Sequence, residues 1–70
     1  MSDHKFLADI GSRIKELRIK NKISQIELAG LCNFEKASMS RIESGKSNIT
    51  ILTLRKISKA LKVEISEILI

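Results

Sequence analysis

Two short helical patterns joined by a tight turn, within residues 24–45, constrain this 70-residue chain more than any other feature. Ser24 and Glu27 have the spacing of a capping box, in which each side chain bonds a free backbone N–H at a helix start. Leu28, Leu31 and Cys32 then form an apolar stripe at positions i, i+3 and i+4. The pattern predicts a helix over about residues 25–32.

The turn and the second helix follow directly. Asn33 ends the first pattern, because Asn tolerates the left-handed conformation that closes a helix. Phe34 is the apolar residue after the turn, and Met39 and Ile42 provide an inward face. Gly45 then marks an exit after a helix over about residues 36–44. The outward face of this second helix is short, polar and partly cationic, and consists of Glu35, Lys36, Ala37, Ser40 and Arg41.

Apolar residues repeat at helical spacing on both sides of this unit. Upstream, the repeat predicts a helix from about residue 6 to 19 with a core face made of Phe6, Leu7, Ile10, Ile14 and Leu17. Residues 1–4 are expected to be a flexible leader. Downstream, Thr50 caps a helix over about 51–61, and a last helical turn or two follows Glu64. The chain therefore reads as one all-α domain of five helices, residues 1–70.

Composition agrees with a small helical domain and narrows its function. Apolar residues make up 43% of the chain, charged residues 30%, and proline is absent. A domain of this size buries roughly 60% of its unfolded surface, which is too little to build a deep catalytic cleft. The net charge of +5 has the sign expected for a polyanionic partner, although many other proteins are also basic.

The chemistry-bearing residues do not suggest an enzyme or a metal protein. Cys32 lies on an apolar stripe, which favours a buried small hydrophobic residue over a reactive thiol. His4 has no Cys or acidic partner at ligand spacing. No catalytic constellation is present, so we expect no cofactor and no small-molecule ligand. The absence of a signal peptide and of a long apolar run predicts a cytoplasmic protein with no membrane contact.

The segment over residues 24–45 resembles the helix-turn-helix of the phage repressor and Cro family, also called the xenobiotic-response-element type. The resemblance lies in Ser24-Gln25, Leu28-Ala29 and the run Ser40-Arg41-Ile42-Glu43-Ser44-Gly45, and it extends from about residue 10 to 68. It implies a compact lambda-repressor-like fold of five helices, with the DNA-binding motif at the second and third. Residues 47–50 also resemble the controller proteins of restriction-modification systems.

Three turn residues depart from the family pattern. Asn33 and Lys62 stand where Gly is commoner, and Ile49 stands where Pro often occurs. None of the three removes an apolar anchor, so only the detail of the loops is affected.

The resemblance implies binding of double-stranded DNA in the major groove, read by the outward face of the third helix. Arg41 and Lys36 can donate to guanine, and Ala37 can contact a thymine methyl group. Ser40 belongs to the same face. Glu35 can accept from cytosine or simply complement the helix dipole, and Arg41 can alternatively contact a phosphate.

A second set of residues is expected to hold the DNA backbone rather than read the sequence. Its members lie at the start of the second helix and around the end of the third, and are Gln25, Ser38, Ser44, Lys46, Ser47 and Asn48. Ordinary turn and capping chemistry is the alternative for these residues. The resemblance further implies that Arg18 and Glu43 form a partly buried ion pair that ties the first helix to the third.

The apolar side chains of the C-terminal tail are expected to be buried against another surface, and a single short recognition helix is expected to act together with that of a second copy. Both points predict a homodimer with an interface at Ile65, Ile68, Leu69 and Ile70. The most plausible function is therefore a dimeric transcriptional regulator on a two-fold symmetric operator. The alternative is an antitoxin or another protein-interaction module. RNA binding is disfavoured because Phe6 and Phe34, the aromatic residues of the chain, appear in the predicted core and offer no stacking platform.

Overall fold

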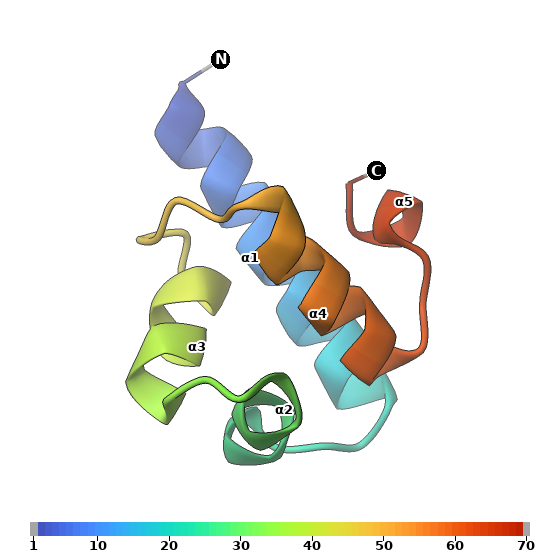
Figure 1. Ribbon diagram of the computed structural model, residues 1–70. Coiled ribbons are helices and arrows are strands. Elements are labelled where there is room, and N and C mark those ends of the chain that lie inside the picture. Colours follow the sequence, from blue (N-terminus) through green and yellow to red (C-terminus); the bar gives the residue numbers. More distant parts are fainter. Residues whose placement is uncertain (1, 70) are drawn as a thin grey trace.

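The computed structural model describes residues 2–69, and this part of the chain is all-helical, as the sequence predicts. Its elements are α1 (Asp3–Lys20), α2 (Gln25–Cys32), α3 (Lys36–Glu43), α4 (Ile51–Leu61) and α5 (Ile65–Ile68). Figure 1 shows α1 and α4 in the middle of the molecule, α3 and α5 on opposite sides of them, and α2 below. α1 packs against α3, α4 and α5, whereas α2 packs against α3 and α4.

α1 begins at Asp3, earlier than the sequence suggests, so residues 3 and 4 of the expected leader belong to a helix. Ser2 is the N-cap residue, and its hydroxyl accepts a hydrogen bond from the Lys5 amide at 3.1 Å. Asp3 in the first turn complements the helix dipole. The first turns of α1 extend beyond the other helices (Figure 1). Phe6, expected in the core, is consequently 51% exposed.

α2 has the predicted ends but a different inner face. The capping box is formed, with the Glu27 amide 3.0 Å from the Ser24 hydroxyl and the Ser24 amide 2.8 Å from the Glu27 carboxylate. The hydrogen bond that the Ser24 amide donates to the Glu27 carboxylate, together with the Ser24 side chain, lowers the pKa of Glu27. Leu31, however, is 65% exposed and does not belong to the core. The reason is rotational: at 3.6 residues per turn, a two-turn helix that buries Leu28, Ala29 and Cys32 turns Leu31 outward.

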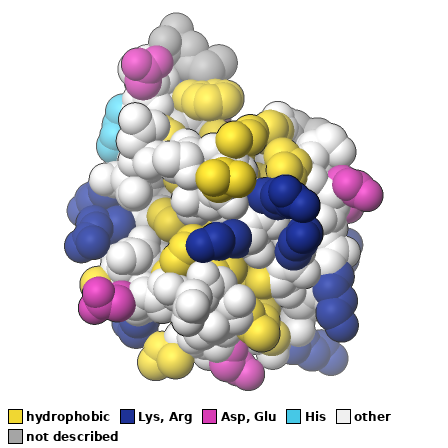
Figure 2. All heavy atoms as spheres, viewed as in Figure 1, with side chains coloured by type: hydrophobic (Ala, Val, Ile, Leu, Met, Phe, Trp, Pro, Cys, Tyr) yellow, Lys and Arg dark blue, Asp and Glu magenta, His cyan; other side chains and the backbone are white. Residues whose placement is uncertain are grey.

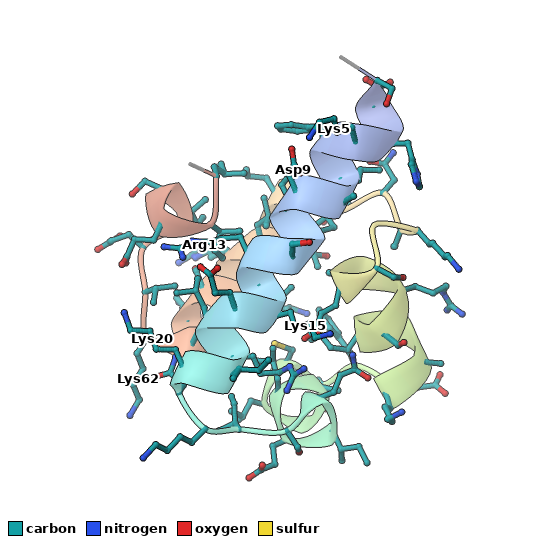
Figure 3. The ribbon with its side chains drawn as sticks, turned by 180° about the vertical axis from the view of Figure 1, so that it is seen from behind. Lys5, Asp9, Arg13, Lys15, Lys20 and Lys62 are labelled. Carbon is teal, nitrogen blue, oxygen red and sulfur yellow. The ribbon has the colours of Figure 1, made fainter. Side chains whose placement is uncertain are left out.

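Every helix contributes to one central core, and six of its side chains are almost completely shielded from solvent. These are Ile14, Leu28, Met39, Ile57, Leu61 and Ile68. Ile68 lies in α5, which begins after Glu64 as expected, and at its start the Glu64 amide donates to the Glu67 carboxylate at 2.8 Å. The guanidinium of Arg13 donates to the Glu67 carbonyl oxygen at 2.8 Å, so α1 holds α5 in place (Figure 3).

Two glycines allow α1 to lie directly against the end of α3, a role that the sequence patterns did not indicate. A Cβ atom at Gly11 would collide with the carbonyl oxygens of Ile42 and Glu43. Gly45 has a φ of +76°, and a Cβ there would lie 2.6 Å from the Cα of Ala8. Backbone therefore packs on backbone at both points, and this contact fixes the position of α3.

Candidate nucleic-acid interface

α3 is divided sharply into a buried and an exposed face. Met39, Ile42 and Glu43 are buried against the other helices. The exposed residues of α3 include four of the five residues that the sequence predicts to read bases: Lys36, Ala37, Ser40 and Arg41. No ion pair engages Lys36 or Arg41 within residues 2–69. These two cations are therefore available to an external acceptor.

Glu35 is the N-cap residue of α3. It is exposed, and its side chain makes no capping hydrogen bond. The carboxylate is thus beside the positive end of the helix, where the dipole favours negative charge. This position is compatible with both alternatives for Glu35, the dipole role and acceptance from a base.

Arg18 and Glu43 form the expected ion pair between α1 and α3. The Nε and Nη2 atoms of Arg18 donate to the two carboxylate oxygens of Glu43 at 2.7 and 3.1 Å, a bidentate arrangement. The side chains are 11% and 3% exposed. Arg18 also donates through Nη1 to the carbonyl oxygen of Ile23 at 3.0 Å. One guanidinium therefore connects α1, the segment before α2 and the end of α3.

Gln25, predicted to bind phosphate, is a third member of this network. Its side-chain amide donates to Oε1 of Glu43 at 3.1 Å. The amide nitrogen thus braces the end of α3 from the first turn of α2. The structure therefore gives Gln25 a bracing contact, and its predicted phosphate contact stays a prediction.

The remaining residues predicted to contact phosphate lie around the C-terminal end of α3, with different exposure. Lys46 and Asn48 are exposed, whereas Ser47 is half-buried. Ser44 is exposed, and its hydroxyl donates to the Arg41 carbonyl oxygen at 3.1 Å, which is a helix-end contact. Ser38 is half-buried and lines a small hollow beside residues 47–49 rather than the outer face of α3.

Some backbone amides of the segment between α3 and α4 donate hydrogen bonds within the protein, and others do not. The N–H of Lys46 donates to the Arg41 carbonyl oxygen at 2.9 Å and so closes α3. Those of Ser47, Asn48 and Ile49 have no acceptor within the described part of the chain. Together with the Lys46 ammonium, they form an open group of donors next to the recognition face. Such donors suit phosphate oxygens.

The predicted dimer residues do not form one surface. Ile68 is only 1% exposed and lies in the core of the domain, so its assignment to an interface is wrong. The reason is that α5 folds back onto α1 and α4 instead of projecting from the domain. Ile65 is half-buried, Leu69 is 43% exposed, and Ile70 lies outside the described residues.

Leu69 instead borders an apolar hollow of about 550 Å³ at the other end of the molecule from α2. We call it the α1–α4 hollow. Its walls come from α1, from the segment before α4, from the start of α4 and from the end of α5, and consist of Asp3, Phe6, Leu7, Ile10, Asn48, Ile49, Ile51, Leu54 and Leu69. Ile51 is 66% exposed. The hollow is therefore an apolar feature that borders the segment after α3.

The Cys32 thiol is buried in the core, and this burial raises its pKa. A protonated, buried thiol is a weak nucleophile, as expected for a structural residue. Among residues 2–69, no helix is long and apolar enough to cross a membrane.

The comparisons with known proteins agree with the structure. The sequence pattern of the helix-turn-helix family matches residues 14–68. The control protein C.BamHI of Bacillus amyloliquefaciens is 35% identical over 60 residues, which cover 84% of this chain and 74% of that protein. The immunity repressor of Bacillus phage phi105 is 32% identical over 59 residues, or 84% of this chain, but this match spans only 41% of the repressor.

A solved structure shows the same arrangement of helices. The restriction-modification controller protein C.AhdI of Aeromonas hydrophila superposes with a TM-score of 0.86 and 31% identity, covering 89% of this chain and 94% of that one. The family and these relatives are regulators rather than enzymes. The chain therefore belongs to the helix-turn-helix family of the repressor and controller type, and it is a DNA-binding transcriptional regulator.

Proposed function

We propose that the protein binds a two-fold symmetric operator as a homodimer and reads its sequence with the exposed face of α3. The observation that carries this proposal is the division of α3: its inner face is locked by the core and the Arg18–Glu43–Gln25 network, while its outer face is polar and free. A rigidly held helix with free donors suits base recognition in the major groove. Because the relatives come from bacteria and a phage, we expect the protein to act in the cytoplasm.

Lys36 and Arg41 are the proposed base-reading cations. They are five positions apart, which corresponds to about 7.5 Å along the helix axis, or about two base-pair steps. Arg41 can donate two hydrogen bonds to one guanine, and Lys36 can donate to another. Ala37, between them, offers a methyl group to thymine, and Ser40 completes the face.

Lys46, Ser47 and Asn48 are the proposed phosphate-binding residues. The exposed ammonium of Lys46 and the free amides after it lie at one end of α3. Ser44 contributes less, because its hydroxyl already donates within the helix end. Such contacts fix the position of the protein on DNA without reading the sequence.

A second copy of the chain is the proposed occupant of the α1–α4 hollow. One wall of the hollow is formed by Asn48 and Ile49, in the segment that follows the recognition helix. Because this wall adjoins the end of α3, a two-fold axis through the hollow is expected to bring both copies of α3 to one side of the proposed dimer. Two such helices are expected to occupy half-sites about 34 Å apart, one turn of DNA. The exposed Phe6, Ile51 and Leu69 supply the apolar contact.

The experiment that tests this function separates base reading from phosphate binding. Bound sequences are first selected from random DNA, and affinities are then measured on operators with single base substitutions at several salt concentrations. Arg41→Ala is expected to cost about 1–3 kcal/mol on the preferred operator and to abolish discrimination at one base pair per half-site. Lys46→Ala should instead weaken binding to all sequences similarly and reduce the salt slope by about one per site.

Lys59→Ala is the matched control for Lys46→Ala, because Lys59 is also an exposed lysine but lies near the far end of α4. Its operator affinity should equal that of the wild-type protein. A uniform loss of affinity across the panel for Arg41→Ala would move Arg41 to the phosphate-binding group. If no sequence is enriched from random DNA, the proposed operator recognition is wrong.

A further inference from the structure

The net charge of the protein is concentrated in one segment. Residues 44–63 contain five cations, Lys46, Arg55, Lys56, Lys59 and Lys62, and none of the eight carboxylates. The rest of the chain has eight cations and eight carboxylates, so its formal charge is zero and this segment accounts for the whole net charge of +5. Four of the five cations lie on α4 or at its C-cap rather than beside the recognition helix.

Within residues 2–69, these four cations have no carboxylate partner. Arg55, Lys56, Lys59 and Lys62 are exposed, and none of them forms an ion pair within the described residues. In contrast, Lys5 and Arg13 on α1 pair with nearby carboxylates (Figure 3). The ammonium of Lys56 lies 5.7 Å from the centre of the Phe34 ring, which holds one cation close to the end of α2.

An exposed leucine lies between these lysines. Leu31 at the end of α2 is 65% exposed, and Ala60 on α4 is half-buried next to it. Two open hollows of about 660 and 410 Å³ share Leu31, Lys59 and Ala60 as walls. We call the set Leu31, Lys56, Lys59, Ala60 and Lys62 the α2–α4 surface. Figure 2 shows cations beside apolar side chains on the face that carries α4, with the carboxylates at its edges.

This surface is not placed to bind the operator. The residues proposed to contact DNA lie at the start of α2, on α3 and before α4, whereas the α2–α4 surface is formed by the C-terminal halves of α2 and α4. Lys59 is nine residues beyond Thr50, which is about 13 Å along the helix. DNA phosphates also provide no apolar complement for an exposed leucine. Both points favour a protein partner over a second strand of DNA contacts.

We propose that the α2–α4 surface binds an acidic amphipathic helix of a partner protein while the regulator is on DNA. The lysines match carboxylates flanking the partner helix, and its apolar side chains enter the hollows on either side of Leu31. The surface is small and shallow, so the complex is a transient one. Binding at this surface requires no particular operator sequence and does not involve the base contacts proposed for α3.

The probe is a synthetic helical peptide of about 14 residues with leucines at i, i+3 and i+4 and glutamates beside them. Added to ¹⁵N-labelled protein, it should shift the amide resonances of residues 30–33 and 56–62. Lys59→Glu should weaken this binding about fivefold or more, because it replaces an attraction by a repulsion. Leu31→Ser should also weaken it while leaving the charge unchanged.

Lys5→Glu is the matched control, since it changes the net charge equally on the distant first turns of α1. The peptide affinity of this variant should stay close to that of the wild type. Equal losses for Lys5→Glu and Lys59→Glu, or shifts confined to α3 or to the α1–α4 hollow, would overturn the proposal. So would a loss of operator affinity and salt slope in Lys59→Glu, because it would assign the surface to DNA. An unchanged operator affinity supports a separate protein-binding surface.

Discussion

At the scale of single residues, the position of the recognition helix depends on one buried carboxylate. Glu43 ends α3 and accepts hydrogen bonds from Arg18 on α1 and Gln25 on α2. A charge with 3% side-chain exposure is tolerated only when its hydrogen-bonding capacity is used. The network therefore links three helices at the C-terminal end of α3, the helix proposed to read DNA.

Removal of either charged partner is expected to be costly. Arg18→Ala and Glu43→Ala should each lower the free energy of unfolding by about 3 kcal/mol, because each leaves an uncompensated buried charge. The double variant should lose less than the sum, since neither charge remains. Urea denaturation of the four proteins measures this coupling. Additive losses would show that the two side chains act independently.

At the scale of elements, helix ends are decided by residues in the left-handed conformation. Asn33 ends α2 with a φ of 64°, and Lys62 ends α4 with a φ of 59°. Both stand where the family more often has Gly. The left-handed conformation has a small free-energy cost for Asn, whereas the longer side chain of Lys crowds the backbone in it. α4 therefore ends at a strained residue.

Lys62→Gly is expected to stabilise the protein. Glycine adopts a positive φ without the Cβ penalty, so the free energy of unfolding should rise by about 1 kcal/mol. Lys59→Gly is the control, because the same substitution within α4 should lower stability by about 1 kcal/mol. Chemical denaturation followed by circular dichroism distinguishes the two. A destabilised Lys62→Gly variant would mean that the lysine side chain contributes more than its backbone strain costs.

At the scale of the whole molecule, two apolar surfaces remain open at different ends of the fold. The α1–α4 hollow borders the segment after the recognition helix, and the α2–α4 surface lies at the opposite ends of α2 and α4. The first is almost free of charge, whereas the second is surrounded by lysines. This difference supports a self-complementary contact at the hollow and an acidic partner at the surface.

The dimer proposal predicts opposite results for two equally exposed side chains. Ile51→Asp at the hollow should convert a dimer into a monomer in sedimentation at micromolar concentration, because it places a charge in an apolar interface. Leu31→Asp is the control and should remain dimeric. Both residues are about two-thirds exposed, so neither change should disrupt the core. A wild-type protein that is monomeric both free and on its operator would refute the interface.

Local sequence determined the helices and their ends. The Ser24–Glu27 capping box, the Asn33 turn and the Thr50 cap act within three or four residues of the chain, so their effects can be derived from spacing alone. The exposed face of α3 follows for the same reason, because burial of Met39 and Ile42 directs Lys36, Ala37, Ser40 and Arg41 outward. The Arg18–Glu43 pair came instead from the resemblance to a known family.

Tertiary structure alone decided which apolar residues are buried and which surfaces stay open. Phe6 and Leu31 have helical spacing typical of core residues, yet both are exposed, because α1 extends beyond its neighbours and α2 buries another face. Ile68 is in the core because α5 packs onto α1 and α4 and is held there by the hydrogen bond from Arg13 to the Glu67 carbonyl oxygen. The burial of these residues depends on how separate helices pack together. The apolar pattern of one helix does not specify which other helices cover it.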